Sequence, residues 1–171
     1  MPMVNGLEVN IDDFNRRRNN CYTYAINQPI NPHTKEPYIM YDHCQPGNLG
    51  GRTTNFFEII RDCHYSHMIK AVRADLRAIG YDIVRTTWAK RVPNDNCWKV
   101  ALAVEPPDID HDNPDYHWFR LNKDGSWSHK LGPYEIKTQD FSRDIIKDPR
   151  TCDRGRYEIF MGFYMIKRKV S

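Results

Sequence analysis

Cys21 is the residue whose sequence context best suits covalent chemistry. It follows Asn19 and Asn20, either of which can cap the start of a helix, and Pro29 stops the helix from continuing, so we predict a short helix over residues 19–27. The free N–H groups and the macrodipole at a helix N-terminus lower the pKa of a thiol. Cys21 is therefore the candidate nucleophile. The other four cysteines lack this context, because two lie in expected loops, one lies within a helix and one opens an apolar strand (Cys44, Cys152, Cys63 and Cys97).

A pair of histidines offers the base that such a thiol needs. Two expected strands flank the sequence NKDG at residues 122–125, which is a strong hairpin turn. His117 and His129 then fall nearly opposite each other and share one face of the sheet. One imidazole can take the thiol proton, while the other fixes the tautomer of the first and supports its charged form. Cys21 facing this pair would complete a nucleophilic Cys–His–His triad.

The elements that position these groups are helices followed by strands. A loop rich in proline and glycine covers residues 28–54, and a helix over residues 55–79 is predicted with Asn55 as its cap. One helical turn is expected at 140–146. This order predicts a single α+β domain over residues 1–171, in which N-terminal helices pack on a mostly antiparallel sheet of about five strands. The expected strands are 81–87, 97–104, 116–121, 126–131 and 157–167.

The arrangement resembles the papain-like cysteine peptidases and amidases, in particular the compact NlpC-type branch. The matching segments are NCYTYA at residues 20–25, DYHWFR at 115–120 and DGSWSHK at 124–130, with the cysteine before the histidines in the chain. The whole is similar to an uncharacterised bacterial or phage subgroup of that clan. The resemblance implies a papain-like fold with Cys21 as nucleophile, His117 as base and His129 as the third member of the triad.

An active site of this kind also needs hydrogen-bond donors for the oxyanion. The main-chain N–H of Cys21 is one. Asn15 lies six residues before Cys21, the offset at which papain carries a glutamine, and Asn20 and Tyr22 compete for the same role. Trp118 is a further candidate substrate contact, although the packing of the hairpin is the simpler role for its ring.

Composition excludes several classes of protein. The 25 basic and 22 acidic side chains give a net charge of +3 and no basic tail, so a nucleic-acid partner is not expected. We find neither an apolar stretch of membrane-spanning length nor a signal peptide, which predicts no membrane association and a cytoplasmic location, with release by lysis or a secretion machinery left open. The five cysteines include no Cys-x-x-Cys pair, and no cofactor fingerprint is present, so no disulfide framework, metal or cofactor is expected.

These features together predict a cysteine hydrolase that cleaves an amide or isopeptide bond through an acyl-enzyme. Its substrate would be a protein or a bacterial cell-wall peptide, since many NlpC-type relatives cleave cell-wall peptides. Deamidation or acyl transfer would use the same chemistry. Two alternatives stay open. A non-catalytic module on the same fold would bind protein or nucleic acid beside a vestigial triad, and a metal-dependent nuclease would use His117, His129 and the acidic segment 106–114. Residues 43–47 fit a cleft wall and an ordinary turn equally well.

Overall fold

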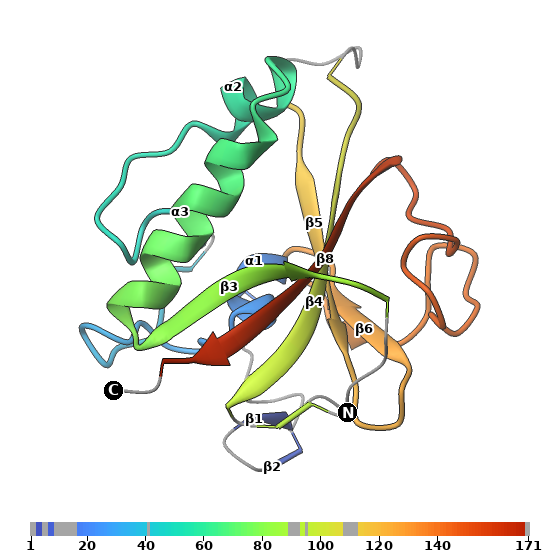
Figure 1. Ribbon diagram of the computed structural model, residues 1–171, viewed down its shortest axis with the longest axis horizontal. Coiled ribbons are helices and arrows are strands. Elements are labelled where there is room, and N and C mark those ends of the chain that lie inside the picture. Colours follow the sequence, from blue (N-terminus) through green and yellow to red (C-terminus); the bar gives the residue numbers. More distant parts are fainter. Residues whose placement is uncertain are drawn as a thin grey trace.

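The computed structural model describes residues 3–4, 7–8, 17–40, 42–88, 93–94, 96–107 and 113–169. Its centre is a six-stranded sheet in the order β3-β8-β4-β5-β6-β7, with antiparallel pairing throughout (Figure 1). A separate pair, β1 (Met3–Val4) with β2 (Leu7–Glu8), lies outside this sheet. The strands of the main sheet are β3 (Tyr81–Thr86), β4 (Cys97–Val104), β5 (Tyr116–Leu121), β6 (Trp127–Lys130), β7 (Ile136–Lys137) and β8 (Ile159–Arg168).

The predicted α+β class and antiparallel sheet are confirmed. All five predicted strands are present. Two have the predicted ends (97–104 and 116–121), the other three have ends shifted by one or two residues, and the two-residue strand β7 makes the sixth. β4 lies inside the sheet between β8 and β5, and all but one of its residues are buried, because both of its faces are covered. The sheet also contains an irregularity where β4 pairs with β8, between Leu102 and Ala103. Gly162 pairs with Leu102 there at a φ of 144°, a backbone conformation that glycine adopts readily.

The long helix predicted over residues 55–79 is instead two helices, α2 (Phe56–Arg61) and α3 (Tyr65–Ala78). The chain turns between them at Cys63, whose φ of 57° is left-handed and cannot continue a helix. The predicted cap is correct, since the Asn55 side chain accepts a hydrogen bond from the main-chain N–H of Glu58. Nothing in the 3.6-residue periodicity marks the break, because both helices place their apolar residues toward the same core.

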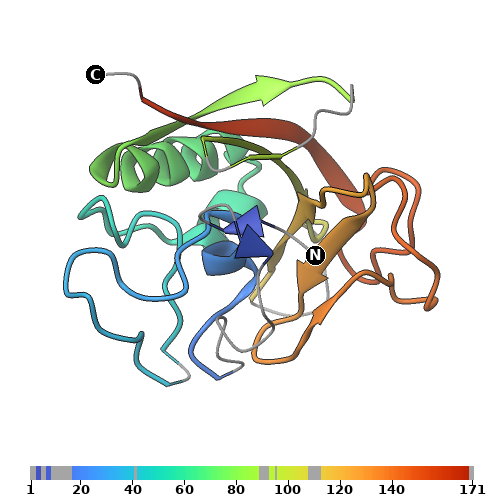
Figure 2. The same cartoon turned by 90° about the horizontal axis from the view of Figure 1, so that it is seen from below.

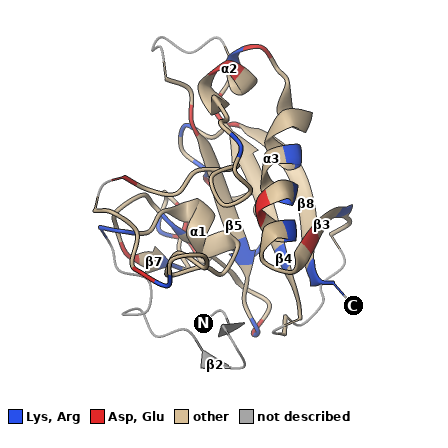
Figure 3. Ribbon diagram, turned by 90° about the vertical axis from the view of Figure 1, so that its left-hand side faces the viewer, with Lys and Arg blue, Asp and Glu red and all other residues tan. Residues whose placement is uncertain are grey.

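Helices and sheet form two cores on opposite faces of the sheet. The helices α1 (Cys21–Ala25) and α3 pack on one face, and Figure 3, which looks onto that face, shows both in front of the strands. The second core contains Phe119, Trp127 and Phe163, and the segment 138–158 covers it. Figure 2 shows this orange-red segment well away from α3. The sheet therefore separates a helical layer from an irregular one.

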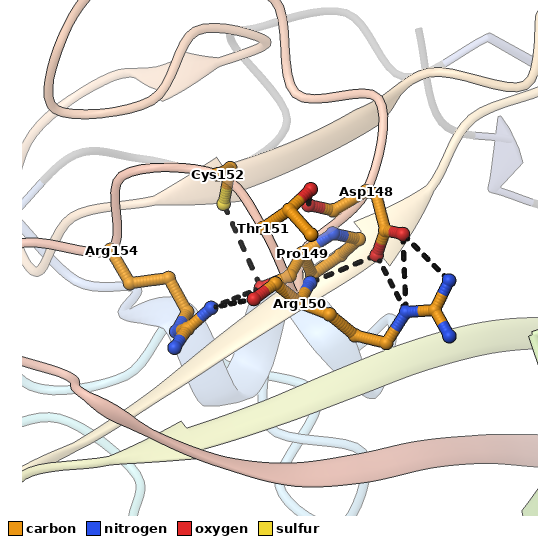
Figure 4. A network of polar contacts seen from close by, with 6 residues as sticks. All are labelled: Asp148, Pro149, Arg150, Thr151, Cys152 and Arg154. Carbon is orange, nitrogen blue, oxygen red and sulfur yellow. Dashed lines mark hydrogen bonds and ion pairs between the residues drawn. The ribbon is translucent and has the colours of Figure 1, made fainter.

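The segment 138–158 has no helix, so the turn predicted at 140–146 is wrong. Side chains rather than helical hydrogen bonds hold this segment together. Arg154 donates to four main-chain carbonyls at distances between 2.6 and 3.0 Å, and Asp148 pairs with Arg150 in a fork at 2.7 Å (Figure 4). The Arg150 guanidinium also lies 4.6 Å from the centroid of the Trp88 ring. These contacts hold the segment against the second core.

No helix in the described part of the chain is long and apolar enough to cross a membrane.

Candidate functional site

Cys21 lies in the first turn of α1, as the sequence predicted, although the helix is shorter than the predicted 19–27 and begins at Cys21 itself. The helix begins with a capping box, in which the Asn20 side chain accepts from the Thr23 N–H at 3.0 Å and the Thr23 hydroxyl accepts from the Asn20 N–H at 3.1 Å. The Cys21 side chain is 7% exposed, and its Sγ donates to the main-chain carbonyl of Tyr116 at 3.9 Å. Cys21 therefore touches β5 at the residue that precedes His117.

His117 and His129 lie on one face of the sheet and are hydrogen-bonded to each other. The register pairs His129 with Phe119 rather than with His117, so the two histidines are diagonal neighbours. Nε2 of His117 lies 2.9 Å from Nδ1 of His129, and Nε2 of His129 lies 2.9 Å from the carbonyl oxygen of Gln139. The prediction that the two rings share one face is confirmed.

This chain of hydrogen bonds determines where the protons sit. A carbonyl oxygen only accepts, so His129 carries its proton on Nε2 and presents the lone pair of Nδ1. His117 must then donate from Nε2, which leaves the lone pair of the neutral ring on Nδ1. Among the described residues, none hydrogen-bonds to that Nδ1. His117 is thus held as the tautomer that can accept a proton there.

Aromatic rings enclose both histidines. His117 stacks on Tyr157 with ring centroids 4.8 Å apart, and His129 stacks on Phe119 at 5.4 Å. Burial favours the neutral imidazoles, so it lowers the pKa of His117 well below its usual range and that of His129 to about 4. Both rings are therefore neutral at pH 7.

The α1 helix packs on the other face of the sheet from the two imidazoles. Trp118 contacts Tyr22, and Ser128 hydrogen-bonds to the Tyr24 hydroxyl at 2.7 Å. Since side chains alternate along a strand, the rings of His117 and His129 point away from this helix. Cys21 meets β5 at its backbone, and within the described residues no hydrogen bond joins its thiol to either imidazole.

The surroundings of Cys21 oppose ionisation of the thiol. Burial raises the pKa of Cys21 to about 12, and the Asp115 carboxylate raises it further. The main-chain N–H of Trp118 and the Lys130 ammonium lower this pKa, but by less. The lowered pKa expected at a helix start is therefore not found, because α1 has only five residues and its first residue is buried. The thiol is protonated at pH 7.

The other predicted site residues are engaged in the structure. Asn20 uses its side-chain oxygen for the helix cap and donates its Nδ2 to the Cys44 carbonyl at 3.0 Å. The Tyr22 hydroxyl donates to Asp75 at 2.5 Å, and Tyr22 and Trp118 are at most 1% exposed. Asn15 lies outside the described residues, as do the aspartates of the acidic segment that a metal-dependent nuclease would need. Among the described residues, no three His, Cys, Asp or Glu side chains are placed to hold a metal ion.

Sequence reasoning missed the residues that tie the loop 44–50 to Cys21 and its surroundings. Asp75, fully buried on α3, accepts from the N–H groups of Gly47 at 2.7 Å and Gly50 at 2.6 Å. The Tyr116 hydroxyl donates to Oε1 of Gln45. The signal in the sequence was Asp75 within an amphipathic helix, because a buried carboxylate needs hydrogen-bond partners. The sequence left open whether residues 43–47 form a cleft wall or an ordinary turn. The structure holds this stretch close to the start of α1.

The structure also contains two pockets outside these contacts. One, of about 600 Å³, lies between residues 52–55 and the helices α2 and α3. His64 and His67 line it, but Cys21, His117 and His129 do not. The other, of about 440 Å³, is lined by residues between Leu131 and Lys137, directly after β6. The second pocket adjoins the strand that carries His129.

The chain is 36% identical over 156 residues to "Insoluble matrix shell protein 1" of Ruditapes philippinarum, an alignment that covers 90% of this chain and 82% of the relative. The chain belongs to the family of this shell matrix protein. No family model matches the sequence, and no solved structure matches the fold.

Proposed function

We propose that this member of the shell matrix protein family is a cysteine hydrolase, with Cys21 as nucleophile, His117 as base and His129 as the residue that orients His117. The observation that carries the proposal is the tautomer of His117. A hydrogen-bond chain of 2.9 Å and 2.9 Å from the Gln139 carbonyl leaves a lone pair on Nδ1, as a general base requires. The Cys21 thiol lies beside the same strand, one residue before this ring.

The proposed reaction cleaves an amide or isopeptide bond in two steps. The thiol proton passes to Nδ1 of His117 as Sγ bonds to the substrate carbonyl carbon, and the resulting tetrahedral intermediate collapses when that proton is delivered to the leaving amine. Water then attacks the thioester, gives one proton to His117 and releases a carboxylic acid and the Cys21 thiol. Deamidation or acyl transfer would differ only in the leaving group or in the acceptor.

The raised pKa of Cys21 favours a mechanism in which the thiol loses its proton only during the attack on the substrate. A protonated thiol and a neutral imidazole that share no hydrogen bond correspond to general-base catalysis during attack rather than to a preformed thiolate–imidazolium pair. Because the His117 ring points to the opposite face of the sheet from α1, both the thiol and the imidazole must change position before the proton can pass between them. Membership of the papain-like clan, a peptide substrate and action in a cell wall or extracellular matrix all belong to this proposal.

Selective alkylation tests the proposal. The folded protein is treated with limiting iodoacetamide between pH 5 and 8, and the five cysteines are read by peptide mass spectrometry. We expect labelling of Cys21 to depend on His117, so that His117→Ala slows it by about 10²-fold, the range of general-base assistance, while labelling of the exposed Cys63 stays unchanged. The matched control is His67→Ala, because His67 is exposed on α3 and should leave the rate unchanged.

A second function, a non-catalytic matrix or binding component with an inert triad, is favoured by one observation. Cys21 is 7% exposed and its thiol carries a raised pKa, as in a structural cysteine. The relative from Ruditapes philippinarum is named as a matrix protein rather than as an enzyme. If Cys21 labels at the same rate in His117→Ala as in the wild type, this second function replaces the first.

A further inference from the structure

The pocket of about 600 Å³ between residues 52–55 and the helices α2 and α3 carries charges of both signs on its walls. Glu58 and Asp62 contribute two carboxylates, one from α2 and one from its C-cap. Arg52, in the loop before α2, and Lys70, on α3, contribute two cations. The volume is within the range of about 300–1,000 Å³ that is usual for sites that bind small molecules. None of the groups proposed for catalysis lines the pocket, so a ligand here would occupy a second site.

These opposite charges border one space but do not pair with each other. Among the described residues, Arg52 and Lys70 take part in no ion pair. Glu58 has none either, and Asp62 pairs only with Arg61, which does not line the pocket, at 3.4 Å. All four charged side chains of the pocket are exposed. A ligand can therefore reach them without the cost of breaking an ion pair across the pocket.

Hydrogen bonds hold the three walls of the pocket in place. The Arg52 N–H donates to the Gly47 carbonyl at 2.8 Å and closes the turn that leads into the first wall. The Asn55 side chain caps α2, the second wall. Between α2 and α3, the His64 N–H donates to the Ile59 carbonyl at 2.8 Å. The charges are thus carried by segments whose relative positions are fixed, and fixed walls reduce the entropic cost of binding.

We propose that this pocket binds a short peptide by its two charged ends. The N-terminal ammonium group contacts the carboxylates of α2 and its cap, and the C-terminal carboxylate contacts Arg52 and Lys70. An ion of a single sign is attracted by one pair of charges and repelled by the other, whereas a zwitterion gains from both. Thr53 and Thr54 also line the pocket, and their hydroxyls can bond to the peptide groups between the two ends. Since a single amino acid would fill only part of the volume, a peptide is favoured. The proposal does not depend on the reaction proposed for Cys21.

Three forms of one peptide test the two ends separately. Triglycine carries both charges at pH 7, N-acetyltriglycine lacks the ammonium group and triglycine amide lacks the carboxylate. Main-chain amide chemical shifts of the full chain, measured by nuclear magnetic resonance, report both the affinity and the place of binding. We expect triglycine to shift the amides of residues 52–71 and to bind about fivefold more tightly than either blocked form, the contribution of one exposed ion pair. Equal affinities for the three forms, or glycine that binds as tightly as triglycine, would overturn the proposal.

Substitutions assign each end of the peptide to its wall. We expect Glu58→Gln to reduce the preference for triglycine over N-acetyltriglycine and to keep the preference over triglycine amide, because only a partner of the ammonium group is removed. Lys70→Gln should do the reverse. The matched controls Glu36→Gln and Lys147→Gln, exposed elsewhere on the protein, should keep both preferences. If the two pocket variants keep both preferences while folded, the peptide does not bind as proposed.

A second pair of variants keeps the test decisive if one of the first pair does not fold. Asp62→Asn and Arg52→Gln remove the other carboxylate and the other cation of the pocket, and unfolding curves identify the variants that are folded. Inorganic phosphate is titrated as well. Phosphate that shifts the same amides and binds more tightly than triglycine would indicate a simple anion site and overturn the proposal.

Discussion

At the residue scale, the histidine pair depends on a single carbonyl. Gln139 accepts from His129, and this one contact sets the tautomers of both rings. The sequence predicted that the two rings share a face, because alternation along a hairpin is a local rule. It could not predict the tautomer, since Gln139 belongs to a segment whose path depends on tertiary contacts. The same limit applies to Gln45, which reaches Tyr116 across a long stretch of chain.

The pH dependence of stability tests the burial of His129. Its folded pKa of about 4 lies below the ordinary 6.5, so the unfolded chain binds this proton more readily. The contribution is full above pH 6.5 and is lost as the pH falls toward 4, by up to about 3 kcal/mol at about 1.4 kcal/mol per pH unit. His129→Gln can keep both hydrogen bonds without titrating.

Urea unfolding at several pH values measures this effect. We expect the free energy of unfolding of His129→Gln to fall less steeply than that of the wild type between pH 6.5 and 4. The exposed His67→Gln is the control and should follow the wild type. Equal slopes for His129→Gln and the wild type would mean that His129 is not buried in its neutral form.

At the element scale, the loop 44–50 and α3 fit together without spare room. A Cβ on Gly50 would lie 2.7 Å from the main-chain carbon of Ala74 and 2.9 Å from the nitrogen of Asp75, both on the α3 backbone. The loop therefore approaches the helix as closely as glycine permits, and the Gly50 N–H reaches Asp75 at 2.6 Å. The proline and glycine content suggested a structured loop, but only the fold identifies the helix that it contacts.

Gly50→Ala should destabilise the protein by about 1–3 kcal/mol, the usual range for overpacking against a fixed backbone. Gly51→Ala is the control, because its Cβ would meet no atom within 4 Å, although its φ of 67° adds the strain of a left-handed residue, about 1 kcal/mol. Chemical denaturation compares the two. A Gly50→Ala variant as stable as Gly51→Ala would show that the loop can move away from α3.

The helices illustrate how far pattern reading extends. The cap Asn55 was predictable, as was a cap at Asn19 or Asn20, of which the structure uses Asn20, since an Asn side chain followed by helix-forming residues needs only local geometry. The break at Cys63 was not, because a left-handed cysteine has no sequence signature and both helices continue one apolar stripe. The helical turn predicted at 140–146 failed for a related reason, since side-chain contacts with distant residues override a weak local preference there.

At the scale of the whole molecule, the segment 138–158 acts as the second layer of the protein. It closes the face that carries the histidines, and its own order comes from Arg154 and from the Asp148–Arg150 pair (Figure 4). Since Gln139 and Tyr157 contact the two histidines, the stability of this layer and the geometry of the proposed base are coupled.

Arg154→Lys should loosen this layer, because an ammonium cannot form the four hydrogen bonds to carbonyls that the guanidinium makes. We expect a loss of about 2 kcal/mol in the free energy of unfolding and faster alkylation of the half-buried Cys152. Arg143→Lys, on the exposed surface of the same segment, should change neither quantity. Unchanged labelling of Cys152 in Arg154→Lys would contradict the role given to Arg154.

The order of strands in the sheet has a consequence for synthesis of the protein on the ribosome. In the main sheet, β3 pairs with β8 alone, yet β8 is the last of the described strands to be made. While the chain emerges, β3 and the helix α3 that packs on it therefore have no neighbour in the sheet, although the β4–β5–β6 part can already assemble. The nascent protein must carry β3 as an unpaired strand until β8 arrives and inserts between β3 and β4. During that interval it is open to capture by chaperones or by a neighbouring copy.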